Sequence, residues 1–136
     1  MKFEYKNGLI FVSIEIEYDK KPIKISRCIL DTGSATTAID IDQIVFNYDK
    51  PARIRRLFGI GSGVQEVICQ QVDTLTIDKF SIPEIEIEFG TLKSSLGING
   101  FIGNDILSHF HVSLGYQKKE LVLNPVNIAG KKVTRN

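Results

Sequence analysis

Apolar and polar residues alternate along much of the chain with the period of two that is typical of β-strands. The alternation is clearest at residues 12–17 and 85–89, where apolar side chains are separated by serine or glutamate. This pattern predicts strands that bury one face and expose the other. Strands are expected at residues 3–6, 8–18, 23–30, 36–39, 67–77, 80–89, 111–116 and 119–123.

Turn residues separate these runs. The pair Asn7-Gly8 predicts a tight hairpin, because both residues tolerate positive φ. A second turn is expected at residues 19–22, and residues 47–56 are expected to form an irregular polar connection. Pro83 indicates that the first part of its strand lies at a sheet edge.

Two short helices are expected among the strands. Asp40 is a suitable N-cap for a helix at residues 41–47. Asn104 or Asp105 is a suitable N-cap for a helix at about residues 105–109.

Length and composition predict one soluble globular domain. The chain has 136 residues, enough to bury a core without disulfides, and its net charge of +1 argues against a dedicated nucleic-acid binder. No stretch approaches the roughly 18 apolar residues of a membrane span, and the N-terminus lacks the apolar run of a signal peptide. We therefore expect a cytoplasmic protein with no membrane partner. Its domain is expected at residues 1–124, followed by a polar, frayed tail at 125–136.

The most informative stretch is Cys-Ile-Leu-Asp-Thr-Gly-Ser at residues 28–34. An aliphatic run that ends in Asp-Thr-Gly predicts a buried strand with the carboxylate of Asp31 at its end. Gly33 permits a tight turn, and the hydroxyls of Thr32 and Ser34 are small donors suited to holding a carboxylate. Function is therefore sought first at Asp31, although an Asx turn that only ends a strand remains an alternative.

Three glycines alternate with other residues in the run Leu-Phe-Gly-Ile-Gly-Ser-Gly-Val at residues 57–64. A phosphate-binding loop would need the spacing GxxxxGK[ST], or GxGxxG followed by a helix, and neither is present. Because strand-like residues follow, the tip of a hairpin is favoured over a nucleotide loop.

A second apolar pair followed by glycine occurs at Phe101-Ile102-Gly103. Two strand ends with glycines suited to close approach, one before a turn and one before a helix, suggest crossing strands that present a loop to the surface.

The cysteines and histidines do not suggest a metal or another cofactor. Cys28 and Cys69 have neither CxxC spacing nor the pattern of a disulfide framework, and Cys28 is expected to be a small core residue. His109 and His111 lie two residues apart without a third ligand nearby, which favours partly exposed polar residues over a metal pair.

In their order along the chain, the motifs at residues 29–34, 58–61 and 101–107 resemble the retropepsin-like aspartic proteases. The likeness covers roughly residues 8–123 and is greater to the single-domain cellular and bacterial members than to the retroviral ones. The resemblance implies an all-β fold, a small closed β-barrel with one or two short helices, and a homodimer. It also implies an aspartic endopeptidase that acts on a peptide or protein substrate.

The same resemblance assigns roles to individual residues. Asp31 would be catalytic, Thr32 would lock the two motif loops together across the two-fold axis, and Gly33 and Ser34 would shape the carboxylate. A second group, made of Ile102 and Gly103, would support the floor beneath Asp31. The flap that closes over a bound peptide would comprise Phe58, Gly59, Ile60 and Gly61.

Peptide hydrolysis without a metal or a covalent nucleophile needs a base that activates water and an acid that protonates the amide. Two carboxylates that share one proton supply both, a dyad that is a standard example of coupled titration. The chain has one Asp-Thr-Gly motif, so an isologous dimer would bring two copies of Asp31 together.

The chain departs from the retroviral pattern at two positions. In retroviral members the residue after the second glycine is typically arginine, which pairs with an acid four positions beyond the catalytic aspartate. Asn104 and Ala35 occupy these positions here, so both halves of that ion pair are absent.

Substrate preference is only partly indicated. Apolar pockets would be lined by Ile39, Phe58, Ile60 and Phe101, while arginines at positions 53, 55 and 56 would either favour acidic substrates or simply be solvated.

Two other functions remain open on the sequence alone. The first is a protease-like binding or assembly module without turnover, since a fold does not fix a function. The second is a small-molecule-binding β-barrel in which residues 59–63 form an ordinary hairpin tip.

Overall fold

The computed structural model describes residues 1–58, 64–92, 97–126 and 132–136, most of which lie in strands. None of the described helices has the length and hydropathy needed to cross a membrane. The elements are β1 (Glu4–Lys6), β2 (Leu9–Tyr18), β3 (Lys21–Leu30), β4 (Ala38–Asp40), the 3-10 helix η1 (Ile41–Gln43), β5 (Arg53–Phe58), β6 (Val64–Ile77), β7 (Phe80–Gly90), β8 (Gly100–Ile102), α1 (Asn104–Leu107), β9 (Phe110–Gly115), β10 (Glu120–Pro125) and β11 (Thr134–Arg135).

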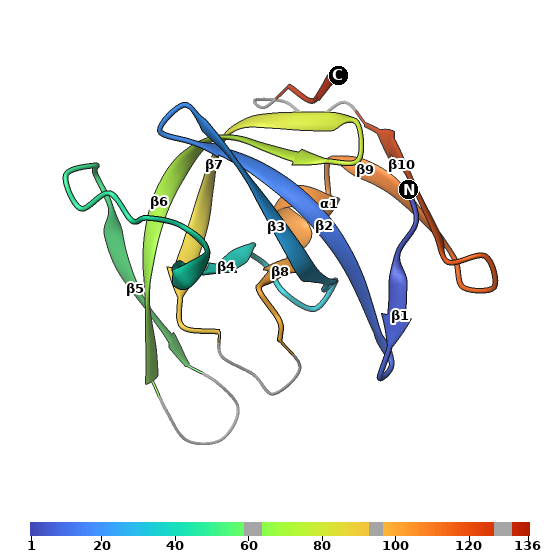
Figure 1. Cartoon of the computed structure of the whole chain (residues 1–136), viewed down its shortest axis with the longest axis horizontal. Helices are drawn as coiled ribbons and strands as arrows, with labels where there is room; N and C mark the ends of the chain where they lie inside the picture. Colours follow the sequence, from blue (N-terminus) through green and yellow to red (C-terminus); the bar gives the residue numbers. More distant parts are fainter. Residues whose placement is uncertain (59–63, 93–96, 127–131) are drawn as a thin grey trace.

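Most of the strands belong to one curved sheet (Figure 1). Its order is β1-β2-β3-β8-β4-β7-β6-β5, and a further pairing joins β2 to β6. Hydrogen-bonded neighbours therefore lead from β2 through β3, β8, β4, β7 and β6 back to β2. Strands β9 and β10 form a separate two-stranded hairpin, as predicted. The β-rich architecture expected from the alternating pattern is confirmed.

Two-residue turns connect the first three strands. Asn7 and Gly8 have φ values of 53° and 76°, which confirms the predicted hairpin between β1 and β2. Asp19 and Lys20 have φ values of 50° and 64° and connect β2 to β3. The predicted turn at 19–22 is therefore too long, because positive φ at two consecutive residues reverses the chain within them.

Both helices are shorter than predicted. The Asp40 side chain caps η1 by accepting a hydrogen bond from the backbone N–H of Asp42 at 2.9 Å, as expected. The N-cap residue of α1 is Gly103, which has no side chain to cap the helix, while the Asp105 carboxylate inside the turn accepts from the backbone N–H of Ile106 at 2.9 Å. The predicted cap at Asn104 or Asp105 is wrong, because both residues lie inside the first turn and their side chains contact a neighbouring loop.

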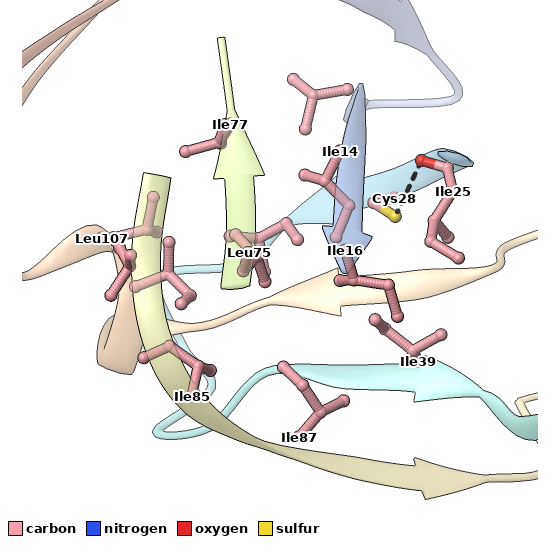
Figure 2. Packing of buried hydrophobic residues seen from close by; sticks show 14 of the residues in the cluster. Ile14, Ile16, Ile25, Cys28, Ile39, Leu75, Ile77, Ile85, Ile87 and Leu107 are labelled. Carbon is pink, nitrogen blue, oxygen red and sulfur yellow. Dashed lines mark hydrogen bonds between the residues drawn. The ribbon is translucent and has the colours of Figure 1, made fainter. Parts of the chain in front are cut away.

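The inward side chains of β2, β3, β4, β6 and β7 pack in one apolar cluster with Leu107 of α1 (Figure 2). Ile85 and Ile87 are buried in it, as the alternation predicts. Glu88 on the opposite face of β7 is also buried, because Arg55 of β5 pairs with its carboxylate at 2.6 Å. The curved sheet thus forms its core on one face and an ion pair on the other.

Cys28 is a core residue, as predicted. Its side chain is fully buried, and Sγ donates to the carbonyl oxygen of Ile25 at 3.7 Å (Figure 2). Burial raises the pKa of the Cys28 thiol to about 12, so the thiol is neutral at neutral pH. A neutral, buried thiol is not a nucleophile, which leaves Cys28 a packing role beside Asp31.

Residues 132–136 do not form the frayed tail that the sequence suggested. Strand β11 pairs with the start of β7, with Thr134 opposite Ser81, and the Asn136 side chain donates to Ser81 Oγ at 2.8 Å. Because β6 occupies one edge of β7 here, β11 covers the other. The edge position inferred from Pro83 explains why a strand can add at this place.

Candidate active site

Asp31 lies directly after β3, where this strand runs parallel to β8 (Figure 1). The pairing places Leu30 opposite Ile102, and the backbone N–H of Asp31 donates to the carbonyl oxygen of Ile102 at 2.9 Å. Asp31 is partly buried, whereas Ile102 is fully buried beneath the end of the strand. The two motifs found in the sequence therefore meet at one place. The crossing of their strands, suggested by the terminal glycines, is wrong, because β3 and β8 lie side by side as parallel neighbours.

The Asp31 loop, residues 31–37, is held by hydrogen bonds within itself. The backbone N–H of Gly33 donates to Asp31 Oδ1 at 3.0 Å, which is the expected contact between Gly33 and the carboxylate. The Ser34 hydroxyl does not hold the carboxylate in this chain, because it donates to the carbonyl oxygen of Thr36 at 2.7 Å. Thr32 is exposed at the tip of the loop.

Gly103 lets two backbone segments approach each other closely. A Cβ at this position would lie 2.6 Å from the carbonyl carbon of Thr36 and 2.9 Å from the carbonyl oxygen of Ser34. Both distances are shorter than real Cβ contacts, so a side chain would displace the Asp31 loop. Gly103 is therefore required by packing, which is consistent with its expected place in the floor of the site.

The start of α1 is hydrogen-bonded to the same loop. The backbone N–H of Asn104 donates to the Ser34 carbonyl oxygen at 2.8 Å, and that of Asp105 donates to the Ala35 carbonyl oxygen at 3.2 Å. The Asn104 side chain donates to the carbonyl oxygen of Thr32 at 2.8 Å. These bonds satisfy N–H groups that the first turn of a helix leaves without partners.

Thr37 and Asp105 link the end of the loop to α1 by two hydrogen bonds, which were not predicted from the sequence. The Asp105 carboxylate accepts from the Thr37 hydroxyl at 2.7 Å and from the Thr37 backbone N–H at 3.0 Å. The same hydroxyl accepts from the backbone N–H of Gly103 at 3.0 Å, and Thr37 is fully buried. The only sequence signal was Asp105 near a helix start, which suggested a cap instead.

Replacing Thr37 by valine should lower the free energy of unfolding by about 2 kcal/mol, because it leaves the buried N–H of Gly103 without an acceptor. Urea unfolding followed by circular dichroism would measure this loss. Thr74→Val is a matched control, since the Thr74 hydroxyl is only partly buried and makes no hydrogen bond within the described residues. Equal losses in both variants would contradict the role of the Thr37 hydroxyl.

The expected flap lies largely outside the described residues. Strands β5 and β6 pair up to Phe58, opposite Val64, so the predicted hairpin is confirmed as far as its last pair. Gly59, Ile60 and Gly61 fall outside the residues that the structure describes, and their role as a flap remains a prediction.

The base of this hairpin carries two ion pairs. Arg53 Nε donates to Glu86 Oε1 at 3.1 Å, and Arg55 pairs with Glu88, so β5 is tied across β6 to β7. The irregular connection predicted for residues 47–56 is wrong at its end, because β5 already begins at Arg53. These two arginines are therefore engaged by glutamates of the same chain.

The residues predicted to line apolar substrate pockets do not lie together in the structure. Ile39 is fully buried in the main core, so it does not line an open pocket. Phe101 is partly buried and packs against a second, smaller apolar cluster that includes Phe11 and Ile29. Ile60 lies outside the described residues.

Other groups do not provide a competing site. His109 is buried and His111 is exposed, and the described part of the chain contains no group of three His, Cys, Asp or Glu residues suited to a metal ion. A cavity of about 400 Å³ lies beside β10 and the start of β7, lined in part by Phe80 and Leu121, but Asp31 is not among its lining residues. Among the described residues, Asp31 therefore stays the candidate for a chemical role.

The sequence matches no family model and no curated protein. Among solved structures, the fold is similar to the crystal structure of a retropepsin-like aspartic protease from Rickettsia conorii, with a TM-score of 0.56 and 17% sequence identity. The match covers 90% of this chain and 85% of that one. The chain therefore has a fold that resembles a retropepsin-like aspartic protease.

Proposed function

We propose that this protein is an aspartic endopeptidase that acts as a homodimer, with one Asp31 contributed by each subunit. The observation that carries the proposal is the Asp31 carboxylate at the end of β3, held by the N–H of Gly33. The fold resemblance reported above supports it, as does the close packing of Gly103 under the loop.

The proposed reaction needs both carboxyl groups of the pair. The ionised one accepts a proton from a water molecule, whose oxygen attacks the carbonyl carbon of the peptide. The protonated one donates its proton to the carbonyl oxygen, which gives a diol. The carboxyl group that took the proton from water then passes it to the amide nitrogen as the carbon–nitrogen bond breaks, and the other carboxylate takes a proton back from one diol hydroxyl. In this dimer Thr32, exposed at the loop tip, would contact its symmetry mate.

The substrate would be an extended peptide bound between the Asp31 loop and the tip of the β5–β6 hairpin. Main-chain hydrogen bonds would hold such a peptide, and apolar pockets would select its side chains. In this proposal Gly59, Ile60 and Gly61 close over the peptide as a flap, while Ile102 and Gly103 support the loop from below.

A peptide-library digest at about pH 4 to 6 would test this function directly. The purified protein should cut peptides, and a statine-type inhibitor should stop the cleavage. The specific activity should rise with protein concentration when the protein is dilute, because a monomer holds only one carboxylate of the pair.

Sedimentation of the same samples provides the matching measurement. A strict monomer that still cleaves peptides in an inhibitor-sensitive way would overturn the shared site. A dimer that cleaves no peptide under these conditions would favour a binding or assembly module on the same fold.

A further inference from the structure

The peptide unit between Thr32 and Gly33 is hydrogen-bonded at both of its polar groups. Its carbonyl oxygen accepts from Asn104 Nδ2 at 2.8 Å, and its N–H donates to Asp31 Oδ1 at 3.0 Å. Because a peptide unit is planar, the direction of the carbonyl fixes the direction of the N–H. We propose that Asn104 is a positioning residue that orients the Asp31 carboxylate through this single peptide unit.

Asn104 is itself fixed in place. It is the first residue of α1, and its backbone N–H is bonded to the Ser34 carbonyl oxygen at 2.8 Å. The same turn of helix carries the buried side chains of Ile106 and Leu107. The amide therefore reaches the Thr32 carbonyl from an anchored backbone. An exposed side chain with an anchored backbone can set a direction without contributing much to stability.

The hydrogen bond from the Asn104 amide to the Thr32 carbonyl oxygen also strengthens the hydrogen bond from the Gly33 N–H to Asp31. A donor on a peptide carbonyl polarises the whole unit, so its N–H becomes a better donor to a carboxylate. Asn104 is neutral, and it therefore supports the Asp31 loop without adding a charge beside Asp31.

The consequence for catalysis rests on the function proposed above. A carboxylate that turns away from its productive direction slows the chemical step more than it weakens substrate binding. Loss of the Asn104 amide should therefore lower kcat and leave KM nearly unchanged.

The test compares Asn104→Ala and Asn104→Asp with wild type. Alanine removes the donor, and aspartate keeps the size of the side chain but cannot donate when ionised. Asn99→Asp is a control, because the partly buried Asn99 amide donates to the carbonyl oxygen of Ser26 at 2.9 Å, away from the Thr32–Gly33 unit.

Two measurements are made on each protein. The first is the chemical shift of the Gly33 amide proton in ¹⁵N-labelled protein, which reports its hydrogen bond to Asp31 whether or not the protein cleaves peptides. It should move upfield in both Asn104 variants and stay unchanged in Asn99→Asp. The second is the pair kcat and KM, for which we expect a loss in kcat of about tenfold and a change in KM below about twofold.

The outcomes separate this inference from the proposed function. An unchanged Gly33 shift in both Asn104 variants would overturn the positioning role, even if the wild type is an active protease. Wild type without peptidase activity would refute the proposed function, and the Gly33 shift would still decide the role of Asn104. If the chemical shift of the Gly33 amide proton moves but kcat does not change, the proposed effect of Asn104 on catalysis is wrong.

Discussion

The Asp31→Asn variant should cleave peptides about 10²- to 10⁴-fold more slowly than wild type, the range that a general acid–base group contributes. Asparagine has nearly the same shape, and its carbonyl oxygen can still accept from the N–H of Gly33, so the loop should keep its structure. It cannot accept or release the shared proton. Rates from the peptide digest, with thermal unfolding as a check on folding, would measure the effect.

The same variant should also inhibit the wild type. If equal amounts of the two chains are unfolded and refolded together, about a quarter of the dimers contain two copies of Asp31, so activity should fall to about a quarter of that of wild type at the same total concentration. A fall only to about half, in proportion to the wild-type chain, would mean that each subunit works alone. Unchanged cleavage by Asp31→Asn by itself would point to a contaminating protease.

Gly103→Ala should be strongly destabilising although it adds only a methyl group. That methyl would lie 2.6 Å from the carbonyl carbon of Thr36, and backbone atoms cannot move aside as a flexible side chain can. We expect the free energy of unfolding to fall by about 3 kcal/mol and the Tm by about 10 °C. The φ of Gly103 is −96°, so the effect comes from crowding and not from backbone strain.

Gly115→Ala is the matched control for this substitution. A Cβ at Gly115 in β9 would lie 3.9 Å from its nearest neighbour, the carbonyl oxygen of Glu120. This is an ordinary contact, and the free energy of unfolding should change by no more than about 0.5 kcal/mol. Similar losses of Tm in both variants would contradict the close packing of Gly103 against the Asp31 loop.

Local features of the sequence were sufficient to predict most of the strands. Alternation and turn residues depend on neighbours within a few positions, so β2, β7 and the β9–β10 hairpin could be predicted without knowledge of the fold. Asn7-Gly8 and the Asp40 cap were correct for the same reason. The meeting of Asp31 with Ile102 was expected from the family resemblance, whereas the local pattern suggested crossing strands instead of a parallel pair.

The errors involve contacts between residues far apart in the chain. Asp105 looked like a helix cap because its partner, Thr37, is 68 residues away and has no distinctive local pattern. The pairing of Thr134 with β7 depends on an edge left open in the folded sheet. The exception is Ser34, which was assigned to the carboxylate although its hydroxyl donates to the carbonyl oxygen of Thr36, only two residues away.

The parallel pairing of β3 with β8 also determines when the site can form during protein synthesis. Asp31 is made early, but its backbone partner Ile102 and the α1 residue Asp105, which binds the far end of the loop, come near the end of the chain. Closing a segment of that length carries an entropic cost and slows folding. A nascent chain that has not yet emerged past α1 therefore cannot complete this loop, and the hydrogen bonds that hold it can form only after α1 has been translated.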